Sequence, residues 1–201
     1  SLTASTGVDA LTHAIEADTC RVSQPITDAL ALYAIELISH NIVEAVENGS
    51  NLEARTNMLI GSLMAGISFI NSNVGAVHAI SETIGAWYDT PHGVGNSIFL
   101  PYIMKYNLSA KPERFARIAQ ILGVDGTGMT TEEIAMAGVE KIKELNEKVK
   151  IPKLTALDYI KEDDFRAIAE RSAENALSDD NAKPINTDGY LQVIYEAYND
   201  K

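Results

Sequence analysis

Three of the four histidines in this sequence have the neighbours and the spacing that are typical of metal ligands. His78 lies in the helix-like run GAVHAISETIGAWY, and His92 follows a proline and precedes a glycine. Asp9 precedes His13 by four residues, so both side chains lie on one face of a helix. Neutral imidazole is the commonest protein ligand for zinc, iron, copper and nickel. One carboxylate and three imidazoles therefore indicate a four-ligand site for a divalent metal, formed by Asp9, His13, His78 and His92.

A second interpretation stays open for the same residues, namely that they are unrelated polar side chains bonded to backbone groups. Glu16 follows His13 by three residues and is either an acid that orients an imidazole or a surface residue. Glu82 follows His78 by four and is a fifth ligand, an orienting acid, a general base or a solvated carboxylate. His40 has no nearby acid partner, and we expect it to lie outside any metal site.

The composition limits the classes of partner. At 201 residues the chain is expected to form one domain over residues 1–201, with a sizeable core. The formal charge of −12 argues against nucleic acid or an anionic membrane as a partner. No apolar run approaches the length of a membrane span and no leader opens the sequence, so we expect no membrane association. The single cysteine, Cys20, fits a reducing compartment, and we expect a cytoplasmic protein.

The elements that must position these residues are helices. Helical spacing of apolar residues predicts roughly eight to nine of them, over residues 3–20, 23–49, 50–71, 75–87, 92–107, 112–122 and 130–149, within 155–177, and over 187–200. Ser23, Ser50 and Thr130 are the predicted caps, the last two within capping-box patterns. No strand pair or hairpin signal appears. The predicted fold class is all-α, an orthogonal multi-helix bundle.

Three stretches of the sequence are similar to a known family. TGVDALTHAIEA, the segment GISFINSNVGAVHAISETIGAWYDTPHGVGNSIFLPYIMKYN and the tail ALSDDNAKPINTDGYLQVIYEAY resemble the iron-containing, or group III, alcohol dehydrogenases. The similarity runs over almost the whole chain, and the GxDAxxHxxE and PHGxxN elements are specific at this spacing. The family pairs an N-terminal nucleotide-binding α/β domain with a C-terminal helical domain, in a dehydroquinate synthase-like fold. This chain resembles the helical domain alone.

The resemblance implies that Asp9, His13, His78 and His92 bind Fe²⁺ or Zn²⁺. It also implies the interconversion of small alcohols with aldehydes or ketones by hydride transfer to NAD or NADP, in an enzyme that includes the N-terminal nucleotide-binding domain. A homodimer is a further expectation. Because the sequence contains no glycine-rich phosphate loop, we expect the chain alone to bind metal without turning over alcohol.

Glu82 departs from the family pattern, since the family usually has a second histidine four residues after His78. We expect the Glu82 carboxylate to lie within about one water of the metal and to act as the catalytic acid–base group. Two other functions stay open. One is a metal-dependent hydrolase in which Glu82 is the general base, and the other is a non-catalytic helical module that the metal holds together.

Overall fold

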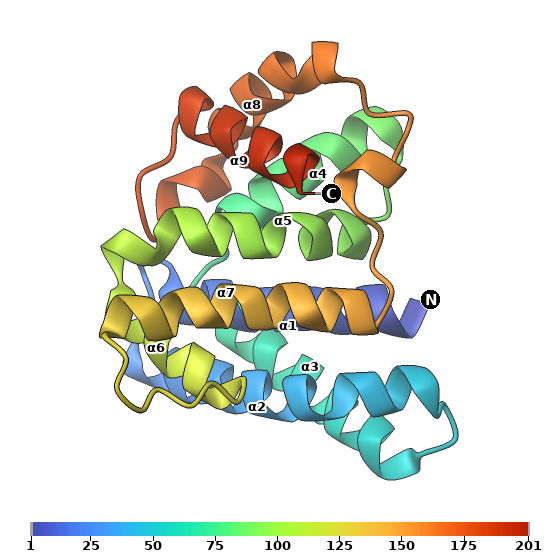
Figure 1. The fold of residues 1–201 in the computed structure, drawn as a ribbon, viewed down its shortest axis with the longest axis vertical. Helices are drawn as coiled ribbons and strands as arrows, with labels where there is room; N and C mark the ends of the chain where they lie inside the picture. Colours follow the sequence, from blue (N-terminus) through green and yellow to red (C-terminus); the bar gives the residue numbers. More distant parts are fainter. Residues whose placement is uncertain (1, 201) are drawn as a thin grey trace.

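Nine α-helices and four short 3₁₀ turns make up the part of the chain that the computed structural model describes, residues 2–200, and no strand occurs there. The prediction of an all-α fold is therefore confirmed (Figure 1). The helices are α1 (Leu2–Thr19), α2 (Pro25–Glu47), α3 (Leu52–Asn71), α4 (Ala76–Tyr88), α5 (His92–Asn107), α6 (Pro112–Ile121), α7 (Thr131–Lys148), α8 (Phe165–Ala173) and α9 (Thr187–Asn199).

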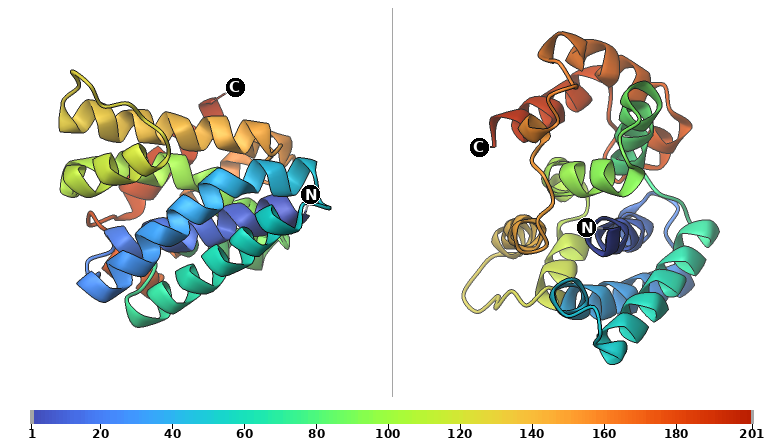
Figure 2. Two further views of the ribbon diagram at one scale, coloured as in Figure 1. Left: turned by 90° about the horizontal axis from the view of Figure 1, so that it is seen from below. Right: turned by 90° about the vertical axis from the view of Figure 1, so that its right-hand side faces the viewer.

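Helix α1 lies in the middle of the bundle. It packs against α2 and α3 on one side and against α5 on the other, as Figure 2 shows where α1 is seen end-on. Small and aliphatic residues fill its core-facing surface, among them Ala4, Val8, Leu11, Ala14 and Ile15, all of which are buried. Because several helices close around it, α1 can hold polar side chains in fixed positions well inside the fold.

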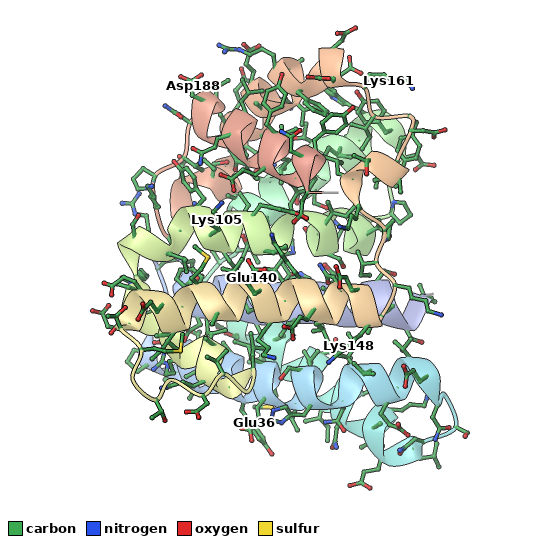
Figure 3. The ribbon with its side chains drawn as sticks, in the orientation of Figure 1. Glu36, Lys105, Glu140, Lys148, Lys161 and Asp188 are labelled. Carbon is green, nitrogen blue, oxygen red and sulfur yellow. The ribbon has the colours of Figure 1, made fainter. Side chains whose placement is uncertain are left out.

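Helices α8 and α9 lie together at one end of the molecule, at the top of Figure 1. Helix α8 packs against α4 and α9, and α9 packs against α5. Helices α6 and α7 pack against each other, with α7 beside α5. Charged side chains such as Glu36, Glu140 and Lys148 lie on the outer surface (Figure 3). Most of the charge of this strongly negative sequence thus lies on the outside of an apolar core, with Glu16 and Asp18 as buried exceptions.

Two changes of direction bring α3, α4 and α5 beside α1. The chain bends by 100° between α3 and α4. A second turn separates α4 from α5, where Asp89 adopts a left-handed conformation with φ of 55° and ends α4. Left-handed backbone at a helix C-terminus is a common way to stop a helix and reverse the chain. His92 is consequently the first residue of α5.

Two of the predicted helix caps are wrong. Helix α2 begins after Gln24, whose backbone N–H donates to the Thr27 hydroxyl at 3.1 Å, so Ser23 lies outside it. Helix α3 is capped by Asn51, whose Oδ1 accepts from the Ala54 N–H at 3.1 Å. Both helices begin about one residue later than the sequence pattern suggested.

The other predicted boundaries agree more closely with the structure. The Thr130 cap is confirmed, because its hydroxyl and the Glu133 carboxylate each accept the other residue's N–H. The helix expected within 155–177 is short: α8 covers Phe165–Ala173, between 3₁₀ turns at Glu162–Asp164 and Ala176–Asp180.

By length and mean hydropathy alone, α2 is long enough and apolar enough to cross a bilayer. In this fold, however, Ala31, Ala34, Ile35, Ile38 and Ile42 of α2 have no exposed surface and belong to the central core cluster. The helix packs against α1 and α3 along its length. One face of α2 therefore belongs to the core of the bundle.

Candidate metal centre

Helix α1 carries Asp9, His13 and Glu16 along one side, because residues three and four apart share a face. The His13 ring bonds through Nδ1 to the backbone carbonyl of Asp9 at 2.9 Å. A carbonyl can only accept, so Nδ1 carries the hydrogen and Nε2 presents a lone pair. The His13 ring also stacks on Phe69 of α3 with ring centroids 4.5 Å apart. Backbone bonding and stacking together fix the direction in which His13 Nε2 points.

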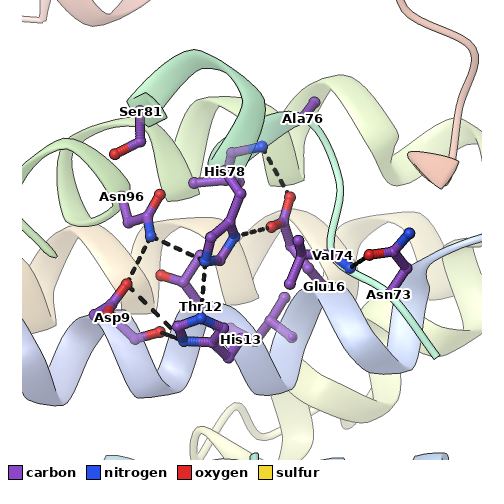
Figure 4. Close-up of polar contacts among 12 residues, drawn as sticks. Asp9, Thr12, His13, Glu16, Asn73, Val74, Ala76, His78, Ser81 and Asn96 are labelled. Atoms are coloured by element: carbon purple, nitrogen blue, oxygen red, sulfur yellow. Dashed lines mark hydrogen bonds and ion pairs between the residues drawn. The ribbon is translucent and has the colours of Figure 1, made fainter. Parts of the chain in front are cut away.

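Helix α4 brings in His78 at its third residue, held by Glu16 (Figure 4). The Glu16 carboxylate accepts from the Val77 N–H at 2.8 Å and from His78 Nδ1 at 2.5 Å. The first N–H groups of a helix have no partner within the helix, and a negative charge is stabilised there. Glu16 therefore caps α4 and orients the His78 ring with a single carboxylate. Both side chains are almost fully buried.

Helix α5 provides His92, and the glycine after it allows α5 to approach α1. A Cβ at Gly93 would lie 2.6 Å from the Ser5 carbonyl oxygen and 3.4 Å from Asp9 Cβ. The first contact is with backbone and cannot be relieved by rotating a side chain. The His92 carbonyl also accepts from the Ser81 hydroxyl at 3.0 Å, which ties α5 to α4. The glycine of the PHG element is thus required for close packing of α5 on α1, and this packing places His92 near Asp9.

The four side chains converge on one point. Asp9, His13, His78 and His92 each offer one ligand atom, and these atoms all lie within 4.8 Å of one another. His13 Nε2 is 3.0 Å from His78 Nε2, and Asp9 Oδ1 is 3.7 Å from His92 Nε2. Ligands of a tetrahedral divalent ion at about 2.1 Å are separated by roughly 3.4 Å. The two distances lie on either side of this value, and the metal-ligand role of the four residues stays a prediction.

The tautomers of two rings make the cluster suited to a cation. His13 and His78 both use Nδ1 as a donor, to a carbonyl and to a carboxylate. Their Nε2 atoms consequently face each other as lone pairs at 3.0 Å, which repel unless a proton or a metal ion lies between them. Burial, and next the His78 charge, lower the pKa of His13. Burial is the largest single influence on His78 and lowers its pKa, but the hydrogen bond to Glu16 and the charges of Glu16 and Asp9 together outweigh burial, so the pKa of His78 is raised.

The cluster is buried on one side and open on the other. The His78 side chain is 4% exposed and that of His13 is 18% exposed, whereas the His92 side chain is 45% exposed. A site that is enclosed by three helices and accessible beside one ligand can hold an ion and still admit a small molecule. This arrangement is the one that catalytic metal sites use.

Asn96 is a residue of this cluster to which the sequence analysis assigned no role, although it is the last position of the PHGxxN element. It lies one turn after His92 on α5 and is fully buried. Its Nδ2 is 2.6 Å from Asp9 Oδ1, 3.1 Å from His78 Nε2 and 3.0 Å from His92 Nε2. The spacing of four residues from His92 was the signal that could have identified it.

Two other residues considered in the sequence analysis, Glu82 and His40, lie outside the cluster. Glu82 is exposed, is not one of the four converging residues, and accepts a hydrogen bond from Asn175 Nδ2 at 2.9 Å. Its catalytic role stays a prediction. His40 is also outside the cluster, as expected, and its Nε2 lies 3.2 Å from the Ile121 carbonyl oxygen.

Comparison with known proteins gives one consistent result. The model of the Fe-containing alcohol dehydrogenase family, C-terminal, matches residues 3–198. The 1,3-propanediol dehydrogenase of Klebsiella pneumoniae is 41% identical over 198 residues, and the NAD-dependent methanol dehydrogenase of Bacillus methanolicus is 37% identical over 196 residues. Each match covers 98% of this chain and 51% of the relative. The chain thus spans about half the length of the curated relatives it matches.

Solved structures agree with the sequence relatives. The fold superposes on a 1,3-propanediol oxidoreductase with a TM-score of 0.95 at 41% identity, covering 98% of this chain and 51% of that one. An alcohol dehydrogenase from Oenococcus oeni gives a TM-score of 0.95 at 39% identity, with the same coverage. The helical bundle, its converging histidines and these matches lead to one conclusion: the chain belongs to the Fe-containing alcohol dehydrogenase family and corresponds to its C-terminal part.

Proposed function

We propose that this chain is the metal-binding helical half of an NAD(P)-dependent alcohol dehydrogenase that interconverts small alcohols with aldehydes or ketones. The observation that carries the proposal is the convergence of Asp9, His13, His78 and His92, with two histidine lone pairs facing each other at 3.0 Å. Membership in the family supports the reaction class. The names of the relatives, propanediol and methanol dehydrogenases, support a small alcohol as the substrate.

The donor set fits Fe²⁺, and it fits Zn²⁺ as well, since imidazole and carboxylate suit both ions. A bound divalent ion would polarise the oxygen of the alcohol and so favour loss of a hydride from the adjacent carbon. The chain supplies the rest of the site. Asp9 offsets part of the ion's charge, Glu16 fixes the tautomer of His78, and the open side beside His92 gives the alcohol access. Phe69, stacked on His13, provides an apolar surface next to the ligands.

Glu82 is the proposed proton-transfer group. It lies one helical turn after His78 and is exposed, and its carboxylate is a minor one of the charges that raise the pKa of that ring. The bond from Asn175 holds its carboxylate at the surface. From there it can exchange a proton with solvent, which an alcohol oxidation must release.

The nicotinamide cofactor, NAD or NADP, and the surface that binds it belong in this proposal to the N-terminal half that the longer relatives have. An exposed apolar face on α3 supports such a partner. Leu59, Ile60, Leu63, Ile67 and Ile70 are all at least 42% exposed, and no charged residue interrupts them. Large exposed apolar patches usually mark a contact surface. We also propose a homodimer and a cytoplasmic location, the latter supported by the free, buried thiol of Cys20.

A titration tests the proposal. The 201-residue chain should bind one Fe²⁺ or Zn²⁺ and should not reduce NAD or NADP with propanediol, methanol or butanol. The same chain joined to the N-terminal half of the Klebsiella pneumoniae relative should gain metal-dependent, nucleotide-dependent turnover. A chain that binds no divalent metal would contradict the proposal.

The same titration separates the alternatives. Ester or amide hydrolysis by the metal-loaded chain without nucleotide would favour the hydrolase, and metal binding with no activity in the joined protein would favour the metal-held module. Membership in the Fe-containing alcohol dehydrogenase family favours the dehydrogenase over both alternatives.

A further inference from the structure

Asn96 is a buried amide at the centre of the ligand cluster. The residue has no exposed surface, and it is held there from both neighbouring positions of α5. A Cβ at Gly95 would lie 2.5 Å from the Ser81 hydroxyl, so α5 packs closely on α4 at this point. The Ser97 carbonyl accepts from Asn146 Nδ2 of α7 at 2.7 Å. The backbone that carries Asn96 is therefore anchored to two other helices.

The Asn96 amide makes its shortest contact with a carboxylate. Its Nδ2 is 2.6 Å from Asp9 Oδ1, compared with 3.1 Å from His78 Nε2 and 3.0 Å from His92 Nε2. An amide nitrogen has two hydrogens, so it cannot serve three acceptors at once. Hydrogen bonds to a charged acceptor are the stronger ones. The bond to Asp9 is the one that the amide keeps.

The amide oxygen of Asn96, Oδ1, is buried and is left in this orientation without a hydrogen bond in the described part of the chain. Rotating the amide would not solve this, because Oδ1 would then face Asp9 Oδ1, and two acceptors repel. Buried amides normally satisfy both ends. The orientation is consequently set by Asp9, and the amide in turn limits where the Asp9 carboxylate can point.

We propose that Asn96 is a positioning residue that holds Asp9 Oδ1 towards the metal. This inference rests on the proposed function, in which Asp9 and the three histidines bind a divalent ion. With no metal bound, one amide hydrogen bonds to Asp9 and the other is within reach of the lone pair of His78 or of His92, so the amide keeps the carboxylate beside the imidazoles. When a metal takes those lone pairs, the bond to Asp9 remains. Asp9 needs such support because its side chain is 21% exposed and is 3.7 Å or more from His13 Nδ1 and His92 Nε2.

Zn²⁺ affinity, measured by competition with a chromophoric chelator at fixed pH, tests the inference without any enzyme activity. Asn96→Ala should weaken binding by about 10- to 100-fold, the range for residues that orient metal ligands. Asn96→Ser, whose hydroxyl is too short to replace the amide, should give the same loss and is the variant to use if Asn96→Ala does not fold. Asn146→Ala is the matched control. It removes an amide that also has an unpaired Oδ1 and that bonds to the α5 backbone beside Asn96 without contacting a ligand. Its affinity should change by less than about threefold, because the close packing at Gly95 still holds α5 on α4.

A double-mutant cycle shows whether Asn96 acts through Asp9. In an Asp9→Ala background, Asn96→Ala should change the affinity by less than about threefold, since the carboxylate that it orients is gone. Unchanged affinity in Asn96→Ala would overturn this inference and would leave the proposed function standing. An equal loss in Asn146→Ala, or a full loss in the Asp9→Ala background, would also overturn it, because general damage to α5 would then be the cause. A parent chain that does not bind Zn²⁺ would contradict the proposed function, and this inference with it.

Discussion

His13 of α1 and His78 of α4 are 65 positions apart in the sequence, and their Nε2 atoms lie 3.0 Å from each other. Each ring donates from Nδ1, His13 to the Asp9 carbonyl and His78 to Glu16. Two lone pairs at this distance are unfavourable without a cation between them. The pair is therefore held in a geometry that metal binding relieves.

Loss of His78 should abolish this binding. We expect Zn²⁺ at about 100 times its Kd to raise the free energy of unfolding of the parent chain by about 2.7 kcal/mol. His78→Ala should show no such increase, because it removes the buried ligand that Glu16 orients. Urea unfolding with and without Zn²⁺ checks this, and His40→Ala, on an exposed histidine outside the cluster, should respond to Zn²⁺ as the parent does.

Replacing Glu16 should weaken metal binding without removing a ligand. Glu16→Gln keeps the size of the side chain but loses the charge that fixes the Nδ1–H tautomer of His78. We expect a 10- to 100-fold loss of Zn²⁺ affinity. Glu82→Gln is the control for losing one acid, and it should leave the affinity within a factor of about three, because Glu82 bonds to Asn175 instead. Equal effects of the two substitutions would contradict the assignment of Glu16.

The cap of α3 can be tested with neighbouring residues. Asn51→Ala should lower the free energy of unfolding by about 1 kcal/mol, because the Ala54 N–H loses its acceptor. Ser50→Ala should change it by less than about 0.5 kcal/mol, since the Ser50 hydroxyl bonds only to the exposed Asn48 side chain. Chemical denaturation of the two variants decides between them. A larger effect at Ser50 would support the cap that the sequence predicted.

Asp18 should make stability depend on pH. The residue has no exposed surface, and burial raises its pKa to about 6, although Arg117 and Arg114 act in the opposite direction. In the unfolded chain the group titrates near 3.8. Between about pH 4 and 6 the folded state binds the proton more tightly, so the contribution of Asp18 to stability falls as pH rises through this range. The total change is on the order of 3 kcal/mol.

Asp18→Asn removes this titration. The stability of the parent relative to Asp18→Asn should therefore decrease between pH 4 and pH 7, measured by urea unfolding in the presence of a chelator. An increase over the same range would mean that the two arginines outweigh burial.

Glu82 is best tested in a protein that turns over alcohol. In the joined two-half enzyme, Glu82→His should preserve metal binding and shift the pH dependence of turnover, because the introduced imidazole titrates near neutrality. Steady-state rates from pH 5 to 9 provide the readout. Unchanged pH profiles in both Glu82→His and Glu82→Gln would show that the residue has no part in proton transfer.

The sequence by itself determined the helical nature of the fold and the candidate ligands. Helical spacing is a local property, so the all-α class and most helix bounds follow from it, and so does the shared face of Asp9 and His13. The cap of α3 was assigned to the wrong residue because Ser50 and Asn51 can both cap, and the choice depends on backbone conformation at the turn.

The tertiary structure decided how distant residues act on one another. That Glu16 caps α4 and orients His78 depends on the crossing of two helices, and no spacing along the chain reveals it. The role of Asn96 similarly requires α5 to approach α1 at Gly93. Glu82 lies four residues after His78, yet its carboxylate bonds to Asn175 rather than joining the ligand cluster. Shared helical spacing gives an approximate direction, whereas the packing of neighbouring helices selects the partner.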